Sequence, residues 1–349
     1  MTSPFLAEIL EQPEALRRSV NHYPAGHDGL NKLAQTIQTG RQDRVILTGM
    51  GSSLYSCYPL WLSLNTQTAL PATMWDASEL IHFAPNILTP QTVLIAVSQS
   101  GESVELRELI RLANRPGISI AITNGTDNSL ARWADLTLDT HAGDEAAVST
   151  KTYLTTLAVL HLLGTQLSGQ RVENAKDNLN RVAADLSDFL TDWESKLEAM
   201  ANFLGTCESL AYMGRGPSLA SVMTGALITE ESSKVFCMGL SAGQFRHGPL
   251  ELARPGLKAV MFAGSGPVSL LNRRLAQEIG SYGGKCLLIT PAGAEASPNL
   301  FELTIPKAVP GLLPILEIVP VQLLTIRLAQ LRGFEPAAFD HATKVTRSE

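Results

Sequence analysis

The sequence predicts an α/β protein made of two tandem copies of one domain, each copy a doubly wound parallel sheet flanked by helices. Short runs of buried-type residues alternate with helix-like stretches, which is the pattern of βαβ units. The same strand-and-loop pattern also occurs twice along the chain. A chain of 349 residues has room for about two domains of ordinary size, so the two observations agree.

The duplication depends on three strand-like runs that recur in the second half. Their spacing stays between 165 and 167 residues: RVILTG at 44–49 with SLAYMG at 209–214, VLIAV at 93–97 with AVMFA at 259–263, and ISIAIT at 118–123 with KCLLIT at 285–290. A nearly constant spacing over three units indicates an internal repeat, although each match alone is weak. We expect the runs to be strands of two equivalent sheets.

The elements between these runs give the domain boundaries. A glycine-rich turn and a helix from Tyr55 to Leu64 should follow the first strand, and an apolar helix should cover 153–163. One amphipathic helix is expected to link the copies, because its apolar residues recur every three or four positions: Leu179, Val182, Leu186, Leu190, Trp193 and Leu197. The expected segments are a helical lead-in at 1–30, a first domain at 31–170, the linking helix at 171–204, a second domain at 205–333, and a tail at 334–349.

Composition and charge exclude several classes of protein. The net charge is −6 and no block of Lys or Arg occurs, so neither nucleic acid nor an anionic membrane is an expected partner. The N-terminus lacks the basic region of a secretory signal, and apolar runs such as 308–316 are interrupted by Pro310, Gly311 and Pro314. We therefore expect a cytoplasmic protein without a membrane span.

The four cysteines give no sign of a metal site. They lie far apart in the sequence, with no C-x-x-C pair and no histidine at ligand spacing: Cys57, Cys207, Cys237 and Cys286. Buried free thiols are the expected state, and neither a metal nor an organic cofactor is predicted.

Hydroxyl-rich loops should lie at the carboxyl edge of the first sheet, where ligands of parallel sheets collect. Ser52 and Ser53 follow the first strand, residues 98–103 (SQSGES) follow the second, and residues 149–151 (STK) precede the apolar helix. Serine hydroxyls beside a helix N-terminus form a cradle for phosphate, whereas tight turns alone also favour serine and glycine. The spacing fits no nucleotide-binding motif. Because the second copy has GSG at 264–266 instead, we expect the substrate phosphate in the first copy and the loss of that pocket in the second.

A second group of candidates lies near the middle of the second copy. Glu230 and Glu231 end a helical pattern, and His247 stands in a loop bounded by glycine and proline. A carboxylate and an imidazole are the usual groups for moving protons between adjacent carbons and for opening a sugar ring. Equally, a glutamate pair is often a solvated helix face and a single loop histidine is often a surface residue.

Taken together, the motifs resemble the sugar isomerase (SIS) domain family, and specifically the tandem-SIS isomerase half of glucosamine-fructose-6-phosphate aminotransferases. The likeness covers nearly the whole chain, to Lys344. Its pieces are GSS at 51–53, SQSGES at 98–103, DLTL at 135–138, GDE at 143–145, VSTK at 148–151, GRG at 214–216, EE at 230–231, AGQFRHGPL at 242–250 and ATKVT at 342–346. The resemblance implies two tandem SIS domains of flavodoxin-like, doubly wound fold.

The resemblance also implies a role for each matching residue. Positions that hold the sugar phosphate are matched by Ser52, Ser53, Ser98, Gln99, Ser100 and Ser103, and positions that contact the sugar by Val148 and Ser149. Glu231 matches the base that moves a proton between C1 and C2. His247 matches a ring-opening histidine that reaches the site from a neighbouring subunit, so a homodimer with shared sites is implied. Lys344 matches a tail lysine that meets the open-chain carbonyl.

Three departures from the family pattern bear on function. Ile228 stands where the family has a lysine, and Thr224 where it has a glutamate, which alters the groups around ring opening. The chain also begins directly at the SIS region, without a glutaminase domain, so we expect no ammonia supply from glutamine.

The expected reaction is therefore deamination of glucosamine 6-phosphate to fructose 6-phosphate and ammonia, as in SIS-type glucosamine-6-phosphate deaminases. A fructosamine-6-phosphate deglycase or another amino-sugar-phosphate isomerase remains an alternative, since the phosphate loops would look the same. A non-catalytic sugar-phosphate sensor is an alternative of another class. The joint presence of Glu231, His247 and Lys344 argues against a sensor, which has little use for acid-base groups.

Overall fold

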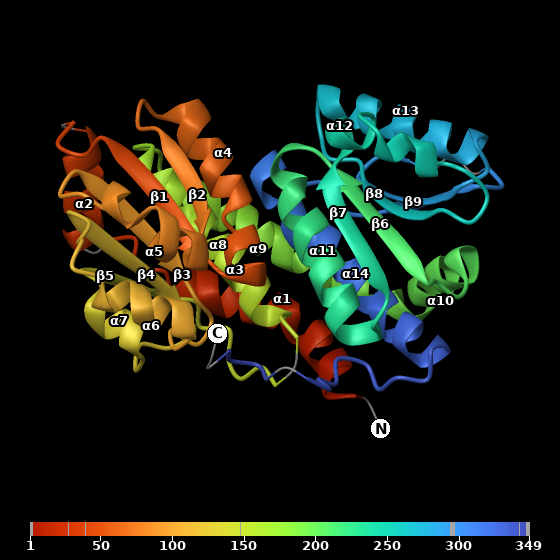
Figure 1. The fold of residues 1–349 in the computed structure, drawn as a ribbon, viewed down its shortest axis with the longest axis horizontal. Coiled ribbons are helices and arrows are strands. Elements are labelled where there is room, and N and C mark those ends of the chain that lie inside the picture. Colours follow the sequence, from red (N-terminus) through yellow and green to blue (C-terminus); the bar gives the residue numbers. More distant parts are fainter. Residues whose placement is uncertain are drawn as a thin grey trace. The chain divides into compact units, whose positions relative to one another are not determined.

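A computed structural model describes residues 3–26, 28–38, 40–146, 148–293, 297–341 and 343–346. The chain divides into two compact units, each built on one parallel sheet (Figure 1). The first-sheet unit comprises Gln12–Glu145, Lys151–Ala183 and His341–Glu349. The second-sheet unit comprises Met1–Glu11, Ala146–Thr150 and Ala184–Asp340.

The first sheet has five parallel strands in the order β2-β1-β3-β4-β5. Its strands are β1 (Arg44–Gly49), β2 (Ala72–Asp76), β3 (Thr92–Val97), β4 (Ile118–Thr123) and β5 (Leu136–Asp139). The helices before, between and after them are α1 (Pro4–His22), α2 (Asp28–Gln38), α3 (Gly51–Tyr55), α4 (Tyr58–Gln67), α5 (Ala77–Phe83), the 3-10 turn η1 (Pro85–Ile87), α6 (Val104–Arg111), α7 (Ser129–Trp133) and α8 (Lys151–Leu167).

The second sheet repeats this order as β7-β6-β8-β9-β10. Its strands are β6 (Ser209–Gly214), β7 (Phe236–Ser241), β8 (Lys258–Phe262), β9 (Lys285–Thr290) and β10 (Leu300–Thr304). The other elements are α9 (Val172–Phe189), η2 (Leu190–Asp192), α10 (Trp193–Leu204), η3 (Gly216–Ser218), α11 (Leu219–Ser233), α12 (Ala242–Phe245), η4 (Pro249–Leu252), α13 (Pro267–Ser281), η5 (Pro310–Leu312) and α14 (Leu313–Leu331).

Helices cover both faces of each sheet, and the strands between them are buried on both sides. In the first unit α5, α6 and α7 pack on one face of the sheet, against a cluster that includes Ile46 and Leu94. In the second unit α12 and α13 pack on one face, whereas α11 and α14 lie on the other (Figure 1). The α/β class and the two parallel, helix-flanked sheets are therefore confirmed.

The strand order fixes where loops diverge. The chain leaves β1 for β2 through α3 and α4, and it leaves β3 for β4 through α6, which packs on the opposite face. The loops after these neighbouring strands separate, and such a switch point is where parallel sheets bind ligands. Gly49 ends β1 here because a Cβ would come within 2.7 Å of the Val97 carbonyl oxygen of β3. By the same order, the switch point of the second sheet lies between β6 and β8.

Two helical expectations need correction. The helix expected at 55–64 is two helices, α3 and α4, because Pro59 occupies the first turn of α4 and cannot continue a preceding helix. The linking segment is likewise α9 and α10 with η2 between them, although its apolar stripe is buried except at Trp193.

The apolar run that was expected to be interrupted by prolines leads into a long helix, α14. Pro314 lies in its first turn, where no backbone N–H is needed, and Pro320 is accepted inside it. The segment Pro310–Leu331 is long and apolar enough to cross a membrane, but 94% of its most apolar window is buried inside the structure. A core helix of a folded unit has this character, because it is covered all round.

Candidate active site

The serine-rich loops lie at the switch point of the first sheet. Ser52 and Ser53 belong to α3, directly after β1, and residues 98–103 connect β3 to α6. Ser98 is buried, and the other serines in these loops are half-buried. The structure thus brings the predicted phosphate residues of both loops to one edge of one sheet.

The turn after β3 is fixed by its own hydrogen bonds. The Gly101 N–H donates to the Ser98 hydroxyl oxygen at 3.1 Å, and the Glu102 N–H donates to the Ser100 hydroxyl oxygen at 3.2 Å. Gly101 has φ +64°, and a Cβ there would lie 1.9 Å from the Asn128 side-chain oxygen, so only glycine fits. A hydroxyl that accepts a bond still has its own proton to donate. Ser98 and Ser100 can therefore donate to an anion without rearrangement of the turn.

The C-terminal tail reaches the same unit. The Val104 N–H, in the first turn of α6, donates to the Thr346 carbonyl oxygen at 3.1 Å. Two residues earlier, the Lys344 ammonium donates to the Glu145 backbone carbonyl and lies 3.3 Å from a Glu145 carboxylate oxygen. Glu145 is buried and also accepts from the Thr152 N–H and hydroxyl, at 3.0 and 2.7 Å. Lys344 and the serine loops therefore belong to one unit. Ala342, part of the tail motif, lies outside the described residues.

The second-sheet unit holds the glutamate pair at the end of α11. Burial raises the pKa of Glu231 to about 7; Lys234 lowers the pKa and Glu230 raises it, both to a lesser extent. Burial also raises the pKa of Glu230. A hydrogen bond that Glu230 accepts from the Cys237 backbone N–H, at 3.2 Å, lowers this pKa to a lesser extent. Glu230 is thus tied to β7 rather than simply solvated, and Glu231 is the carboxyl group able to exchange a proton near neutral pH.

Lys234 closes the end of α11. Its backbone is left-handed, with φ +56°, and its ammonium donates to the Glu231 and Ala338 carbonyl oxygens, each at 2.6 Å. The Ala337 N–H donates to the Ser232 hydroxyl at 3.1 Å. The segment 337–338 is therefore held beside Glu231.

The remaining predicted residues of this unit lie on two other segments. His247 is exposed in the turn between α12 and η4. Its backbone N–H donates to the Gln244 carbonyl oxygen at 2.9 Å. Val148 is buried and Ser149 half-buried, in a segment that Glu8 holds by accepting from the Ala146 N–H at 2.6 Å. The predicted catalytic and sugar-contacting residues are therefore divided between the two units.

The two positions that depart from the family pattern are both buried on α11. Ile228 and Thr224 are fully covered, and the Thr224 hydroxyl has no hydrogen-bond partner among the described residues. An isoleucine side chain supplies no proton and no charge. The ammonium group that a lysine would place at position 228 is therefore absent from this chain.

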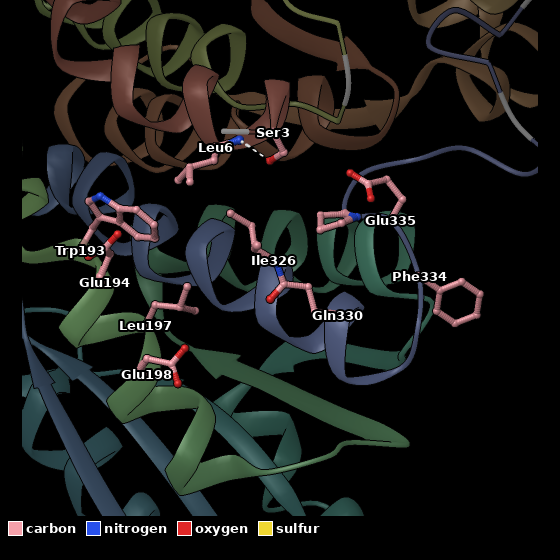
Figure 2. A pocket seen from close by; sticks show the side chains of 11 residues that line it. Ser3, Leu6, Trp193, Glu194, Leu197, Glu198, Ile326, Gln330, Phe334 and Glu335 are labelled. Atoms are coloured by element: carbon pink, nitrogen blue, oxygen red, sulfur yellow. Dashed lines mark hydrogen bonds between the residues drawn. The ribbon is translucent and has the colours of Figure 1, made fainter. Parts of the chain in front are cut away.

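A groove of about 630 Å³ opens elsewhere in the second-sheet unit (Figure 2). Its wall combines the rings of Trp193 and Phe334 with the carboxylates of Glu194, Glu198 and Glu335. None of the predicted site residues lines this groove. Most of the polar side chains that line it are exposed to solvent. The groove is therefore separate from the residues predicted to form the active site.

Comparison with known proteins identifies the first sheet. Residues 40–166 match the family model of the SIS domain, and this range contains β1 to β5 with both serine loops. The chain therefore resembles the SIS domain family over this range. The chain is also 32% identical over 336 residues to glutamine–fructose-6-phosphate aminotransferase from Pyrococcus horikoshii. That match covers 95% of this chain but only 55% of the relative, so the chain spans about half the relative's length.

Solved structures extend the likeness in fold to the second sheet. The C-terminal domain of glucosamine-fructose-6-phosphate aminotransferase from Francisella tularensis has a TM-score of 0.83, with 21% identity, and covers 100% of this chain and 99% of that one. Glucosamine-6-phosphate deaminase from Thermotoga maritima has a TM-score of 0.78, with 20% identity, and covers 99% and 100%. The fold with two parallel sheets in one chain is thus shared with both.

Two contacts of the C-terminal tail with the first-sheet unit were missed by sequence reasoning. The sequence does not show that Thr346 binds the first turn of α6, nor that Glu145 holds Lys344, because these pairs lie far apart in the chain. The one usable signal was the motif GDE at 143–145, which marks Glu145 without saying what it binds.

Proposed function

We propose that this protein is a glucosamine-6-phosphate deaminase, which converts glucosamine 6-phosphate and water to fructose 6-phosphate and ammonia. The observation that carries the proposal is the carboxyl group of Glu231, whose pKa burial raises to about 7 in a chain that resembles amino-sugar-phosphate enzymes. A base with a pKa near the working pH is suited to moving a carbon-bound proton.

The substrate phosphate would bind at the serine loops. Ser98 and Ser100 have hydroxyl protons to donate, and α6 begins directly after the loop, so hydroxyls and the helix N-terminus face the same edge of the sheet. We assign the sugar phosphate to Ser52, Ser53, Ser98, Gln99, Ser100 and Ser103, and contacts with the sugar to Val148 and Ser149. Because the cradle carries no arginine or lysine in these positions, it would bind phosphate mainly through neutral donors.

The chemistry then follows in balanced steps. His247, reaching the site from a neighbouring subunit of a homodimer, assists ring opening to the C1 aldehyde. Glu231 removes the C2 proton and O1 takes a proton from water, which gives an enaminol with hydroxyl on C1 and amine on C2. The same carboxyl group returns its proton to C1 and the amine gives a proton to water, which leaves an imine at C2. Water adds to C2 and ammonia leaves, which yields the ketone of fructose 6-phosphate.

Lys344 is assigned to the open-chain carbonyl. In the structure its ammonium is held by Glu145, so the lysine would exchange this partner for the substrate when the sugar opens. The short distance along the tail from Lys344 to Thr346, which binds α6, keeps the lysine close to the phosphate loops of its own unit.

The state of the cysteines favours deamination over glutamine-dependent synthesis by this chain. All four are buried, and burial raises the pKa of each thiol. A buried thiol with a raised pKa supplies no thiolate to attack glutamine. Release of ammonia needs only water and the acid-base groups already assigned.

The test is an assay of ammonia and fructose 6-phosphate over a panel of substrates. Glucosamine 6-phosphate should give both products in equal amounts. Release of glucose 6-phosphate from a fructosamine 6-phosphate, with glucosamine 6-phosphate inert, would instead establish a deglycase. Tight binding of these compounds without turnover would establish a sensor.

A further inference from the structure

The carboxyl edge of the second sheet differs in chemistry from that of the first. Its switch point lies between β6 and β8, as the repeated strand order requires. Where the first sheet has serines after β1, the loop after β6 begins with Arg215. The serine cradle is absent here, and a cationic group stands at the equivalent edge.

Arg215 is anchored by a buried amide. Its Nη1 donates to the Asn272 side-chain oxygen at 2.5 Å. Asn272, on α13, is fully buried, and its own amide nitrogen donates to the carbonyl oxygens of Phe262 and Ala263 at 3.0 and 3.1 Å. Those carbonyls lie at the end of β8, so one hydrogen-bonded chain joins the loop after β6 to the end of β8. The guanidinium is thereby fixed over the switch point.

The positive charge of Arg215 lacks a carboxylate partner. Among the described residues, no Asp or Glu oxygen lies within 4.0 Å of it. The nearby Arg246 is paired separately, with Glu278 at 2.6 Å. Burial lowers the pKa of Arg215, and the charge of Arg246 lowers it to a lesser extent. The second effect indicates that the two guanidinium groups are close enough to repel each other. The edge therefore carries surplus positive charge.

One side of the Arg215 guanidinium is open. Within the described part of the chain, neither Nε nor Nη2 has a hydrogen-bond partner, and this side faces Gly243. A Cβ at position 243 would lie 3.9 Å from Nη2 and 4.0 Å from Nε, in ordinary contact with both. Two parallel N–H groups are the arrangement that binds a phosphate or carboxylate through two oxygens.

We propose that the switch point of the second sheet binds the phosphate group of a small phosphate monoester through the Nε and Nη2 of Arg215. The anion would neutralise the unpaired charge and lie beside α13, a 15-residue helix whose N-terminus begins at the neighbouring loop with no side-chain cap. A dianion suits this edge better than a singly charged carboxylate, because Arg246 is paired with Glu278 whereas Arg215 has no carboxylate partner among the described residues. This site is separate from the serine loops and does not depend on the proposed reaction.

The experiment measures binding in a protein whose serine loops are disabled. Equilibrium dialysis of the Ser98→Ala, Ser100→Ala double variant with radiolabelled inorganic phosphate, and then with glucose 6-phosphate, should reveal one saturable site per chain. In that background, Arg215→Gln removes the charge, Gly243→Val covers the open side and leaves the charge, and Arg254→Gln removes an exposed arginine as the matched control.

We expect Arg215→Gln and Gly243→Val to weaken binding by about tenfold or more, as for the loss of charged hydrogen bonds, and Arg254→Gln to have no effect. Circular dichroism should show that all variants fold. The proposal is overturned if no saturable site remains in the double variant, or if Arg215→Gln binds like the control. Binding of inorganic phosphate without glucose 6-phosphate, or loss in Arg215→Gln without loss in Gly243→Val, would also refute it. None of these results depends on deaminase activity.

Discussion

The raised pKa of Glu231 makes a prediction that two independent measurements can test. The pKa of this carboxyl group moves from its ordinary value of 4.5 to about 7, chiefly because burial disfavours the charged form. One pKa unit corresponds to about 1.4 kcal/mol, so the full shift corresponds to about 3 kcal/mol. Because the side chain is partly exposed, solvent screening reduces this, and we expect about 1 to 3 kcal/mol.

The sign follows from proton binding in the two states. Between pH 4.5 and pH 7 the folded protein keeps the Glu231 proton more often than the unfolded chain does. Raising the pH through this window therefore lowers the free energy of unfolding. Below pH 4.5 both states are protonated and the penalty vanishes, whereas above pH 7 it is fully present.

Glu231→Gln removes the ionisable group and keeps its shape. Chemical denaturation should show equal stability of the variant and wild type near pH 4.5, and a more stable variant at pH 8. Turnover should fall about 100- to 10,000-fold with little change in substrate affinity, because the base is lost. In the wild type, kcat/KM should rise with pH and level off above about pH 7.

Glu230→Gln is the matched control, since an amide oxygen can still accept from the Cys237 N–H. It should keep turnover within about tenfold of wild type. The reasoning about Glu231 fails if Glu231→Gln retains turnover of that order, or if its stability relative to wild type does not change with pH.

Three further outcomes are expected. Ser100→Ala should weaken sugar-phosphate binding by about 1.5 to 3 kcal/mol, measured by titration calorimetry, and unchanged affinity would remove this loop from the phosphate site. Mixing inactive Glu231→Gln and His247→Ala proteins should restore part of the activity through hybrid dimers, whereas no recovery after proven subunit exchange would place both residues in one chain's site. Glutamine with fructose 6-phosphate should give no glucosamine 6-phosphate, and its formation would contradict the deaminase assignment.

The central strands of each sheet were predictable because they are buried on both faces. β1, β3 and β4, with their counterparts β6, β8 and β9, are short apolar runs, and four of the six end in glycine or threonine. The edge strands gave no such signal. β5 has only four residues, β2 is half-exposed, and β7 begins with Phe236, which is 73% exposed. A strand with one open side shows neither a continuous apolar run nor a regular alternation.

The sequence indicated which loops carry the site but not how they are held. Tight turns and hydroxyls are local features, so residues 98–103 could be singled out from their own composition. The contact between Lys344 and Glu145 joins residues 199 positions apart, and that between Thr346 and Val104 is also long-range. Such pairs arise from the folded chain, and no local pattern of charge or hydropathy specifies them.

The two sheets differ in the loops where ligands would bind, and they share the way in which their first strands end and their helices are capped. Gly49 and Gly214 both end the first strand of a sheet, and Asp76 and Ser241 both cap the helix after the second strand by accepting backbone N–H groups. The helices after β3 and β8 both begin without a capping side chain, so these two loops carry no cap that must be kept. Apart from Gly101, where only glycine fits, substitution in these loops can change the ligand while the sheet stays intact. On this argument, exchanging residues 98–103 for another loop that keeps Gly101 should abolish phosphate binding in the first sheet before it unfolds the domain.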